Sequence, residues 1–316
     1  MEARLTMLHS LKKLVAALGS KRGEGKRNVF LSFPSKSGGG TNTFTANFAK
    51  WLAEHAEEYH QVFRVEHADF AVIVANRSSV EELERAKSAG TFVIHRLDEH
   101  VEPDEDDNRR AKHAAIKELN AFADATVYQS RFVFENMHPF LGEPENHAII
   151  LNGGDTSLFQ PVPEEGKLVG HVTWGVGGKK RLDLLLETIR RHPEERFLLV
   201  GNHAKSGFPF DKEPNAELAG AVPNSALPKL YHRMKCLYFP SENDPCPNTV
   251  VEAMLSGVPV CHNPKGGTVE LVKDCGAPLD EFDDMLSKLD VLRRRCLMRT
   301  DLSFADTARK YIALCP

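Results

Sequence analysis

Short apolar runs alternate with helical patterns along almost the whole chain, and this alternation limits the fold more than any other feature. Strands are expected at residues 28–33, 70–75, 91–95, 125–128, 147–151, 167–174, 196–201, 236–241 and 258–261. Helices are expected between them, for example near 44–52, 79–89, 108–122, 179–192, 227–234 and 248–255, and two more near 280–296 and 303–314. This order of strands and helices predicts an α/β fold with parallel sheets that carry helices on both faces.

The run Pro-Val-Pro-Glu-Glu-Gly at residues 161–166 interrupts the alternation and is the best candidate for a linker. A chain of 316 residues is too long for one ordinary core and suits two domains. We therefore expect two doubly wound domains that face a cleft. In such sheets ligands bind just outside the carboxyl ends of the strands, so the loops that follow strands are where chemistry is expected.

Composition limits the classes of protein to which the chain can belong. Its apolar fraction of 41% and charged fraction of 27% are typical of soluble globular proteins, and a net charge of −4 does not indicate nucleic-acid binding. The six cysteines include no CxxC pair, which favours reduced thiols in a cytoplasmic protein over a disulfide framework or a zinc site. No apolar run reaches the length of a membrane span.

The first 27 residues combine apolar and basic side chains. Leucine and valine recur at helical spacing from Leu5 to Leu18, and lysine and arginine interrupt or follow them. One interpretation is an interfacial helix that contacts anionic lipid and holds the protein peripherally at a membrane surface. The other, which we favour, is a helix packed on its own domain and followed by a basic linker.

A glycine run lies between the first expected strand and the first expected helix. Gly38, Gly39 and Gly40 allow the backbone to approach a ligand closely and leave N–H groups available at the helix start. The spacing fits neither GxGxxG nor a P-loop, because no later glycine and no GK[ST] follow. Two interpretations stay open here, an anion-binding loop and a flexible turn.

The stretch from Glu242 to Val260 joins a polar, proline-containing loop to a short helix pattern. We expect the helix to begin near Asn248, just after Pro247, with Asn248 or Thr249 as its cap. The first N–H groups of this helix and the positive end of its dipole would then form an anion site.

Two carboxylates flank that predicted anion site. Asp244 lies in the loop before the helix, and Glu252 lies about one turn into it. A carboxylate repels an anion but accepts hydrogen bonds from neutral hydroxyls. The pattern therefore suits a ligand with hydroxyls, then phosphate, then hydroxyls, and a nucleotide sugar has this order.

The residues from Tyr238 to Val272 resemble the donor-binding segment of the GT-B retaining glycosyltransferases, specifically the large family 4 group. That family carries a Glu-x7-Glu motif, followed by Ala-Met, Gly-x-Pro-Val, a glycine pair and a glutamate. The matching residues here are Glu252, Ala253, Met254, Gly257, Pro259, Val260, Gly266, Gly267 and Glu270. Asp244 stands where the first glutamate is usual. The resemblance implies that Asp244 contacts the donor sugar and Glu252 the ribose, with Glu242 as a second candidate for the sugar contact.

Other segments are similar to the same family. Residues 149–161 resemble its Ile-x-Asn-Gly-Val-Asp signature, and residues 179–187 resemble its Lys-Gly-x-Asp-Leu-Leu. Lys180 stands in the place of the lysine that contacts the donor diphosphate, whereas Arg181 replaces the glycine. The arginine that usually lies upstream is not evident. The strand end that faces the donor is represented by His95, Arg96 and Asp98.

The resemblance covers roughly residues 28–314 and implies the GT-B fold, with two Rossmann-like domains and a last helix that crosses back to the first. We expect these parts: an N-terminal basic amphipathic extension at 1–27, an acceptor domain at 28–162, a nucleotide-sugar-binding domain at 167–301 and a crossing helix at 302–316.

The resemblance also implies an enzyme that moves a sugar from a nucleotide-diphosphate sugar to an acceptor hydroxyl with retention of configuration. The growing charge on the diphosphate would meet the helix start at Asn248–Thr249, the amides of Gly38–Gly40 and Lys180. Retention would come from attack on the same face, with the departing phosphate helping to take the acceptor proton. His95 is a candidate for orienting the sugar or acceptor, although a lone histidine is more often structural.

Several alternatives stay open at this point. They are a non-catalytic protein that binds a nucleotide sugar, a sugar-nucleotide epimerase, and a phosphorylase, which would normally need a longer chain. The acceptor is a lipid-linked saccharide, a polysaccharide, a protein or a small molecule. No cofactor is expected beyond the nucleotide-sugar substrate, and no metal. Asp104–Asp106 matches DxD, but it lies in a very acidic stretch at a helix start, which favours a solvated surface.

Overall fold

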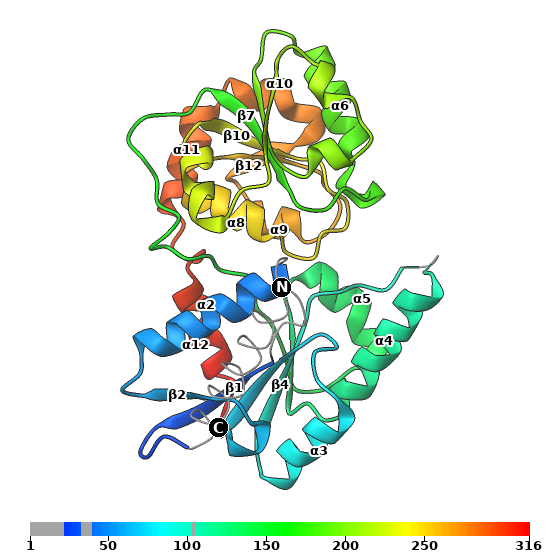
Figure 1. Cartoon of the computed structure of the whole chain (residues 1–316), viewed down its shortest axis with the longest axis vertical. Coiled ribbons are helices and arrows are strands. Elements are labelled where there is room, and N and C mark those ends of the chain that lie inside the picture. Colours follow the sequence, from blue (N-terminus) through cyan, green and yellow to red (C-terminus); the bar gives the residue numbers. More distant parts are fainter. Residues whose placement is uncertain (1–21, 33–39, 103–104) are drawn as a thin grey trace, which may run out of the picture. The chain divides into compact units, whose positions relative to one another are not determined.

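A computed structural model describes residues 22–32, 40–102 and 105–316. These residues form two compact units, and each unit is built on a six-stranded sheet flanked by helices (Figure 1). Unit 1 contains the described residues up to Gln129, with Val133–Ile150 and Ala308–Pro316, and unit 2 contains Ser130–Phe132 and Leu151–Thr307. Every strand pair among the described residues is parallel, which confirms the predicted α/β fold class.

Some predictions fall on residues that the structure does not describe. Most of the predicted extension at residues 1–27 lies outside the described residues, and so do Gly38, Gly39 and Asp104. Helix α2 (Gly40–Glu54) begins at Gly40, the last glycine of the run. No helix in the described part of the chain is long and apolar enough to cross a membrane.

The sheet of unit 1 has the strand order β2-β1-β3-β4-β5-β6. Its strands are β1 (Arg27–Leu31), β2 (Tyr59–Val62), β3 (Phe70–Val74), β4 (Phe92–Leu97), β5 (Ala125–Tyr128) and β6 (His147–Ile149). The helices in this part of the chain are α2 (Gly40–Glu54), η1 (Val65–His67), α3 (Val80–Ser88), α4 (Asp107–Asn120) and α5 (Arg131–Leu141). All five residues of β3 are buried, as expected for a strand covered on both faces.

The last helix, α12 (Phe304–Ile312), returns the chain to unit 1, as predicted. Tyr311 is fully buried, and its ring lies 5.3 Å from Phe44 and 5.9 Å from Phe48 of α2. Figure 1 shows α12 beside α2. Arg27 at the start of β1 donates to the carbonyl of Pro316 at 3.0 Å. The final residues therefore complete the core of the first sheet.

The sheet of unit 2 has the order β12-β11-β10-β7-β8-β9. Its strands are β7 (Leu168–Thr173), β8 (Phe197–Gly201), β9 (Ala216–Gly220), β10 (Met234–Phe239), β11 (Val260–His262) and β12 (Gly276–Pro278). Its helices include α6 (Leu182–Arg191), α7 (Leu227–Tyr231), α8 (Asn248–Leu255), α9 (Thr268–Val272), α10 (Phe282–Leu286) and α11 (Leu289–Met298). Short helical turns are η2 (Gly178–Lys180), η3 (His203–Lys205), η4 (Phe210–Lys212), η5 (Asn224–Ala226) and η6 (Leu279–Glu281).

Side chains of the central strand β10 alternate between two cores. Leu237 and Phe239 belong to a cluster with the buried face of α8, whereas Cys236 and Tyr238 belong to a cluster with α6. This alternation follows from the two-residue period of a strand. Each fully buried Leu or Phe contributes about 1.5–3 kcal/mol, so the two layers hold β7 and β10 firmly under the loops at their ends.

Candidate active site

The strand order of unit 2 reverses at β7: β8 and β9 are added on one side of it, and β10, β11 and β12 on the other. In doubly wound sheets a ligand binds at this switch point, outside the carboxyl ends of the strands. The loops that follow β7 and β10 meet there. Lys180, after β7, places Nζ 3.1 Å from Oδ2 of Asp244, after β10. The structure thus brings together two predicted site residues that are 64 positions apart in sequence.

The glycine pair Gly266–Gly267 supports the loop that carries Asp244. A Cβ on Gly266 would lie 2.9 Å from Cα of Asn243, and one on Gly267 would lie 1.9 Å from the carbonyl oxygen of Pro245. Gly267 N donates to the carbonyl of Asp244 at 2.9 Å. Only glycine permits this approach. The pair lies at the predicted site, where it fixes the backbone around Asp244.

Helix α8 begins at Asn248, as the sequence predicts. The predicted cap is wrong, because the N-cap residue is Pro247 and no side chain caps the helix. The Asn248 side chain instead accepts a hydrogen bond from Asn152 at 3.0 Å. The first turn still lies at the positive end of the helix dipole, where a negative charge is stabilised.

Glu252 is buried, with 6% of its surface exposed. The Tyr231 hydroxyl donates to its Oε2 at 3.1 Å and also to the carbonyl of Thr249 at 3.2 Å. Burial raises the pKa of Glu252 to about 7, although the hydrogen bond from Tyr231 opposes this shift. Burial likewise raises the pKa of Tyr231, so the hydroxyl stays neutral and remains a donor. Glu252 is therefore a carboxylate whose charge is poorly solvated until hydroxyl donors approach it.

The carboxylate of Glu242 is bonded to two cationic side chains. Arg181 Nη1 lies 2.5 Å and Lys265 Nζ 3.3 Å from Oε1 of Glu242. Burial raises the pKa of Glu242, but these hydrogen bonds outweigh burial and keep it below its usual value. Asp244, by contrast, is paired with Lys180, the residue predicted to contact phosphate. This difference favours Asp244 over Glu242 as the carboxylate that contacts a ligand.

Arg181 has a backbone conformation that glycine adopts easily. This explains why the glycosyltransferases that the sequence resembles have a glycine at this position. Its φ of 45° and ψ of 48° are left-handed, and it caps α6 from this position. Such a conformation costs an L-residue roughly 1–2 kcal/mol, whereas glycine adopts it freely. Hydrogen bonds to Asp183 at 2.8 Å and to Glu242 tie the arginine side chain down.

We expect Arg181→Gly to change the free energy of unfolding by less than about 1 kcal/mol, because relief of the left-handed backbone offsets the lost ion pairs. Arg181→Val should cost at least about 1 kcal/mol more than the glycine variant, since a β-branched residue tolerates positive φ poorly. Urea denaturation of the three proteins checks this order. A glycine variant less stable than the valine variant would contradict it.

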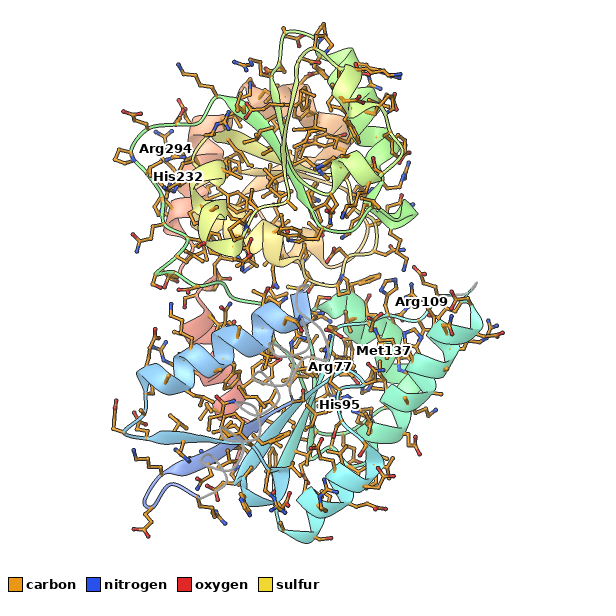
Figure 2. The ribbon with its side chains drawn as sticks, in the orientation of Figure 1. Arg77, His95, Arg109, Met137, His232 and Arg294 are labelled. Carbon is orange, nitrogen blue, oxygen red and sulfur yellow. The ribbon has the colours of Figure 1, made fainter. Side chains whose placement is uncertain are left out.

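His95 lies in unit 1, on β4 (Figure 2). It is 1% exposed, and both ring nitrogens are engaged: Nε2 with the carbonyl of Ala75 at 2.8 Å and Nδ1 with Asn120 at 3.0 Å. Burial lowers its pKa to about 4. These contacts support the left-handed backbone of Ala75, which has a φ of 47°. The suggested contact with sugar or acceptor stays a prediction that this geometry does not favour.

The described part of the stretch that matches DxD has structural partners, and Glu105 is buried, so the expectation of a solvated surface is wrong for this residue. Glu105 contacts Nδ1 of His113 at 2.8 Å, and Asp106 caps α4 by accepting from Arg109 N at 2.8 Å. Among the residues that the structure describes, no three His, Cys, Asp or Glu side chains come together as a metal site would require.

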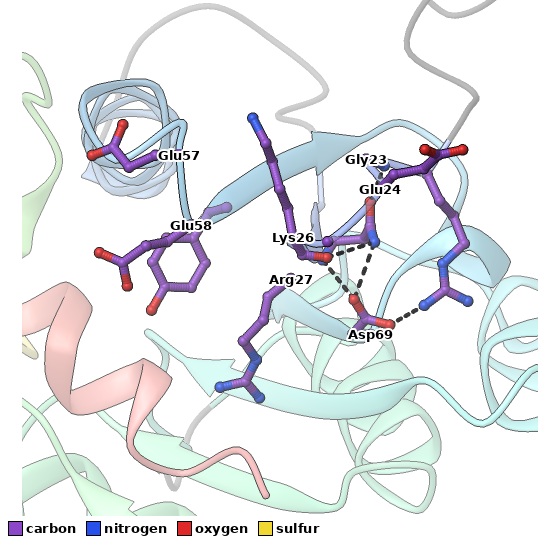
Figure 3. Close-up of a pocket in the computed structure, with 11 residues that line it drawn as sticks. Gly23, Glu24, Lys26, Arg27, Glu57, Glu58 and Asp69 are labelled. Atoms are coloured by element: carbon purple, nitrogen blue, oxygen red, sulfur yellow. Dashed lines mark hydrogen bonds and ion pairs between the residues drawn. The ribbon is translucent and has the colours of Figure 1, made fainter.

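A pocket of about 750 Å³ lies in unit 1 (Figure 3). Arg27, Tyr59 and Asp69 line it, and these residues stand at or just before the starts of β1, β2 and β3. The pocket is therefore at the amino ends of the strands, the opposite edge from the one that binds ligands in such sheets. We do not assign it to the predicted site.

Two residues of the site region were not predicted from sequence. Tyr231 ends α7 and reaches Glu252 across 21 positions, and Asn152 reaches the loop before α8 across 94 positions. Asn152 belongs to the family-like segment at residues 149–161, which marks the region but not its partner.

Comparison with known proteins concerns the family and the fold of the chain. Residues 168–289 match the family model described as glycosyl transferases group 1. No curated protein sequence matches the chain significantly.

Solved structures resemble the chain over most of its length. Sucrose-phosphate synthase from Thermosynechococcus elongatus matches with a TM-score of 0.74 and 14% identity, over 92% of this chain and 98% of that one. The HepE protein of Anabaena, solved with UDP and glucose, matches with a TM-score of 0.61 and 17% identity, over 92% and 95%. AviGT4, a glycosyltransferase of avilamycin A biosynthesis, matches with a TM-score of 0.64 and 14% identity, over 92% and 96%. The chain therefore has the GT-B fold, and residues 168–289 of its second unit match the model of the glycosyl transferases group 1 family.

Proposed function

We propose that this protein transfers a sugar from a nucleotide-diphosphate sugar to an acceptor hydroxyl with retention of configuration. The family match and the fold support sugar transfer. The observation that carries the rest is the order of groups in unit 2: Asp244 paired with Lys180, then the start of α8, then buried Glu252 one turn later. A sugar, a diphosphate and a ribose present complementary groups in this order.

Each group has a physical role in the proposed reaction. Lys180 and the first turn of α8 stabilise the negative charge that grows on the departing diphosphate. Glu252 accepts hydrogen bonds from ribose hydroxyls, which replace the solvation that its burial removes. Asp244 accepts hydrogen bonds from the donor sugar. The departing phosphate helps to take the acceptor proton, so no protein nucleophile is needed.

The solved relatives indicate which donors to test first. HepE was solved with UDP and glucose and also with UDP-glucose, and TarM with UDP and a glycerol glycoside of GlcNAc. A uridine diphosphate sugar is therefore the first donor to examine, with a saccharide or another hydroxyl compound as acceptor.

The test is thermal unfolding with a panel of UDP-, GDP-, ADP- and dTDP-sugars, followed by a transfer assay with the donor that binds. A ligand at 100 times its Kd stabilises by about 2.7 kcal/mol, which raises the midpoint by several degrees. NMR of the product then gives the anomer. A panel without any shift would overturn the proposal, and an inverted product would overturn retention. Binding without donor turnover would reduce the function to nucleotide-sugar binding.

A further inference from the structure

Asn152 lies where the chain enters unit 2, and it is bonded to the loop that leads into α8. Its backbone N–H donates to Cys246 Sγ at 3.3 Å. Its side-chain Nδ2 donates to the carbonyl of Cys246 at 2.8 Å and to Oδ1 of Asn248 at 3.0 Å. Asn152 is only 5% exposed. One buried amide group thus bridges the two sides of Pro247.

This bridge matters because α8 lacks a cap of its own. Its N-cap residue, Pro247, carries no side-chain group that could accept from the first turn, and no side-chain cap is formed. Most helix starts are fixed by a Ser, Thr, Asp or Asn at this position. Here the start of the helix is fixed from outside, by an asparagine that lies almost a hundred residues earlier in the chain.

The segment that holds Asn152 is in turn fixed by the stretch through which the chain leaves unit 2. Gly154 N donates to the carbonyl of Leu302 at 2.8 Å, and Phe304 N donates to the carbonyl of Gly154 at 2.8 Å. The entering and leaving segments therefore run side by side as a short parallel bridge. Asn152 projects from this bridge to α8.

The next two positions leave no room for a side chain. A Cβ on Gly153 would lie 2.4 Å from the carbonyl oxygen of Ser303, and one on Gly154 would lie 2.7 Å from Cδ1 of Leu255. Leu255 is the last residue of α8. The segment therefore contacts α8 at both ends, at its start through Asn152 and at its end through Gly154.

We propose that Asn152 is a positioning residue that sets the first turn of α8 and so aims its N–H groups at the donor diphosphate. The inference rests on the proposed function, because the first turn matters for binding only if a phosphate lies there. Hydrogen bonds weaken steeply with distance and angle, so a small shift of this turn loses binding energy. Cys246 takes part as a hydrogen-bond acceptor, which gives this buried thiol a structural role.

The experiment compares Asn152→Ala with Asn215→Ala. Asn215 is a matched control in the same unit, because its Nδ2 also bridges separate backbone carbonyls, those of Ile189, His192 and Glu195, at 3.0–3.1 Å. It stands just before the amino end of β9, away from the carboxyl ends. Both variants should lower the unfolding midpoint, and the comparison separates lost stability from lost positioning.

Titration calorimetry with UDP, GDP, ADP and dTDP measures the effect on binding. For whichever nucleotide binds the wild type, Asn152→Ala should weaken binding about tenfold, which corresponds to the loss of one to two hydrogen bonds. The affinity of Asn215→Ala should stay within twofold of that of the wild type. Asn152→Asp keeps the size but points an acceptor at the Cys246 carbonyl, and it should weaken binding at least as much. Binding by Asn152→Ala within twofold of wild type would overturn the inference, as would equal losses in both alanine variants or full binding by Asn152→Asp.

Amide hydrogen exchange of the ligand-free protein tests the inference independently of nucleotide binding. Val250 and Val251 donate their N–H groups to the carbonyl of Pro247 at 3.1 and 3.3 Å. These amides should exchange at least several times faster in Asn152→Ala and not in Asn215→Ala. Unchanged exchange would overturn the positioning role. If the wild type binds none of the four nucleotides, the proposed function is contradicted instead. The exchange rates would still test whether Asn152 positions the first turn of α8.

Discussion

Replacing Glu252 by glutamine is expected to weaken nucleotide-sugar binding 10- to 100-fold at pH 8 and, at the same time, to make the ligand-free protein harder to unfold. The first effect follows because hydrogen bonds from hydroxyls to a carboxylate are worth about 1.5–3 kcal/mol, roughly twice those to a neutral amide. Glutamine keeps the size of the side chain and can still accept from Tyr231.

The stability effect follows from the raised pKa of Glu252, which is about 7 in the folded protein because the carboxyl is buried. An unfolded chain has a glutamate pKa of about 4.3. A carboxyl group whose pKa is higher in the folded protein than in the unfolded chain favours the folded state as long as it is protonated. This contribution is fully present below the pKa of the unfolded chain, and it is lost as the pH rises through the pKa of the folded protein. The ionised form therefore lowers stability at pH 8 by roughly 3 kcal/mol, and the glutamine variant is free of this cost.

The same group makes donor binding pH-dependent. If ligand hydroxyls bind the ionised carboxylate, affinity should rise about tenfold from pH 6 to pH 8 as Glu252 loses its proton. A nucleotide sugar is the right ligand, since its diphosphate does not titrate in this range. Calorimetry at several pH values checks the slope, which should vanish in Glu252→Gln.

The control for this prediction is Glu195→Gln. Glu195 is a partly buried glutamate of the same unit, paired with Lys235 at 2.6 Å. Its replacement should leave nucleotide-sugar affinity within twofold and should not add stability at pH 8. A pH-independent wild type, or a glutamine variant at position 252 that binds as tightly as wild type, would remove Glu252 from the site.

Replacing Lys180 by alanine should have the largest effect on the reaction itself. The proposed diphosphate gains negative charge as the sugar departs, and a fixed donor at that point is worth about 2.7–4 kcal/mol, which corresponds to a 100- to 1,000-fold loss in kcat. Steady-state kinetics with the donor found in the thermal panel measures this loss.

Lys235→Ala is the matched control for Lys180→Ala. Both lysines form partly buried pairs with a carboxylate in unit 2, with Nζ–O distances of 3.1 Å for Lys180 and 2.6 Å for Lys235. Loss of either pair should cost little stability. Only the Lys180 variant should lose kcat. Equal rates in the two variants would show that Lys180 does not stabilise the leaving group.

The strands that could be predicted from sequence are mostly those covered on both faces. β3 and β7 are buried along their whole length, and their apolar runs are plain in the sequence. Three strands were not predicted: β2, β9 and β12, and each forms an edge of its sheet. Their side chains are mostly half-buried, so they carry no apolar run that distinguishes them from loops.

The site was predictable where it depends on local pattern. The start of α8 follows from Pro247 and the apolar pattern after it, and the family motifs mark Lys180, Asp244 and Glu252. The Tyr231–Glu252 and Asn152–Cys246 contacts depend on which loops touch in three dimensions. No spacing in the sequence encodes such contacts, and they supply the burial and the positioning on which the proposed chemistry depends.

The return of α12 to unit 1 has a consequence for synthesis of the chain. Unit 1 needs Tyr311 to fill the space beside Phe44 and Phe48, and Tyr311 is synthesised after the whole of unit 2. Unit 2 is almost continuous in sequence and has its own core, so it can fold while unit 1 still lacks that part. The sheet whose strands are synthesised first is thus completed only after unit 2 has been made, and an apolar face of α2 stays uncovered until α12 is synthesised.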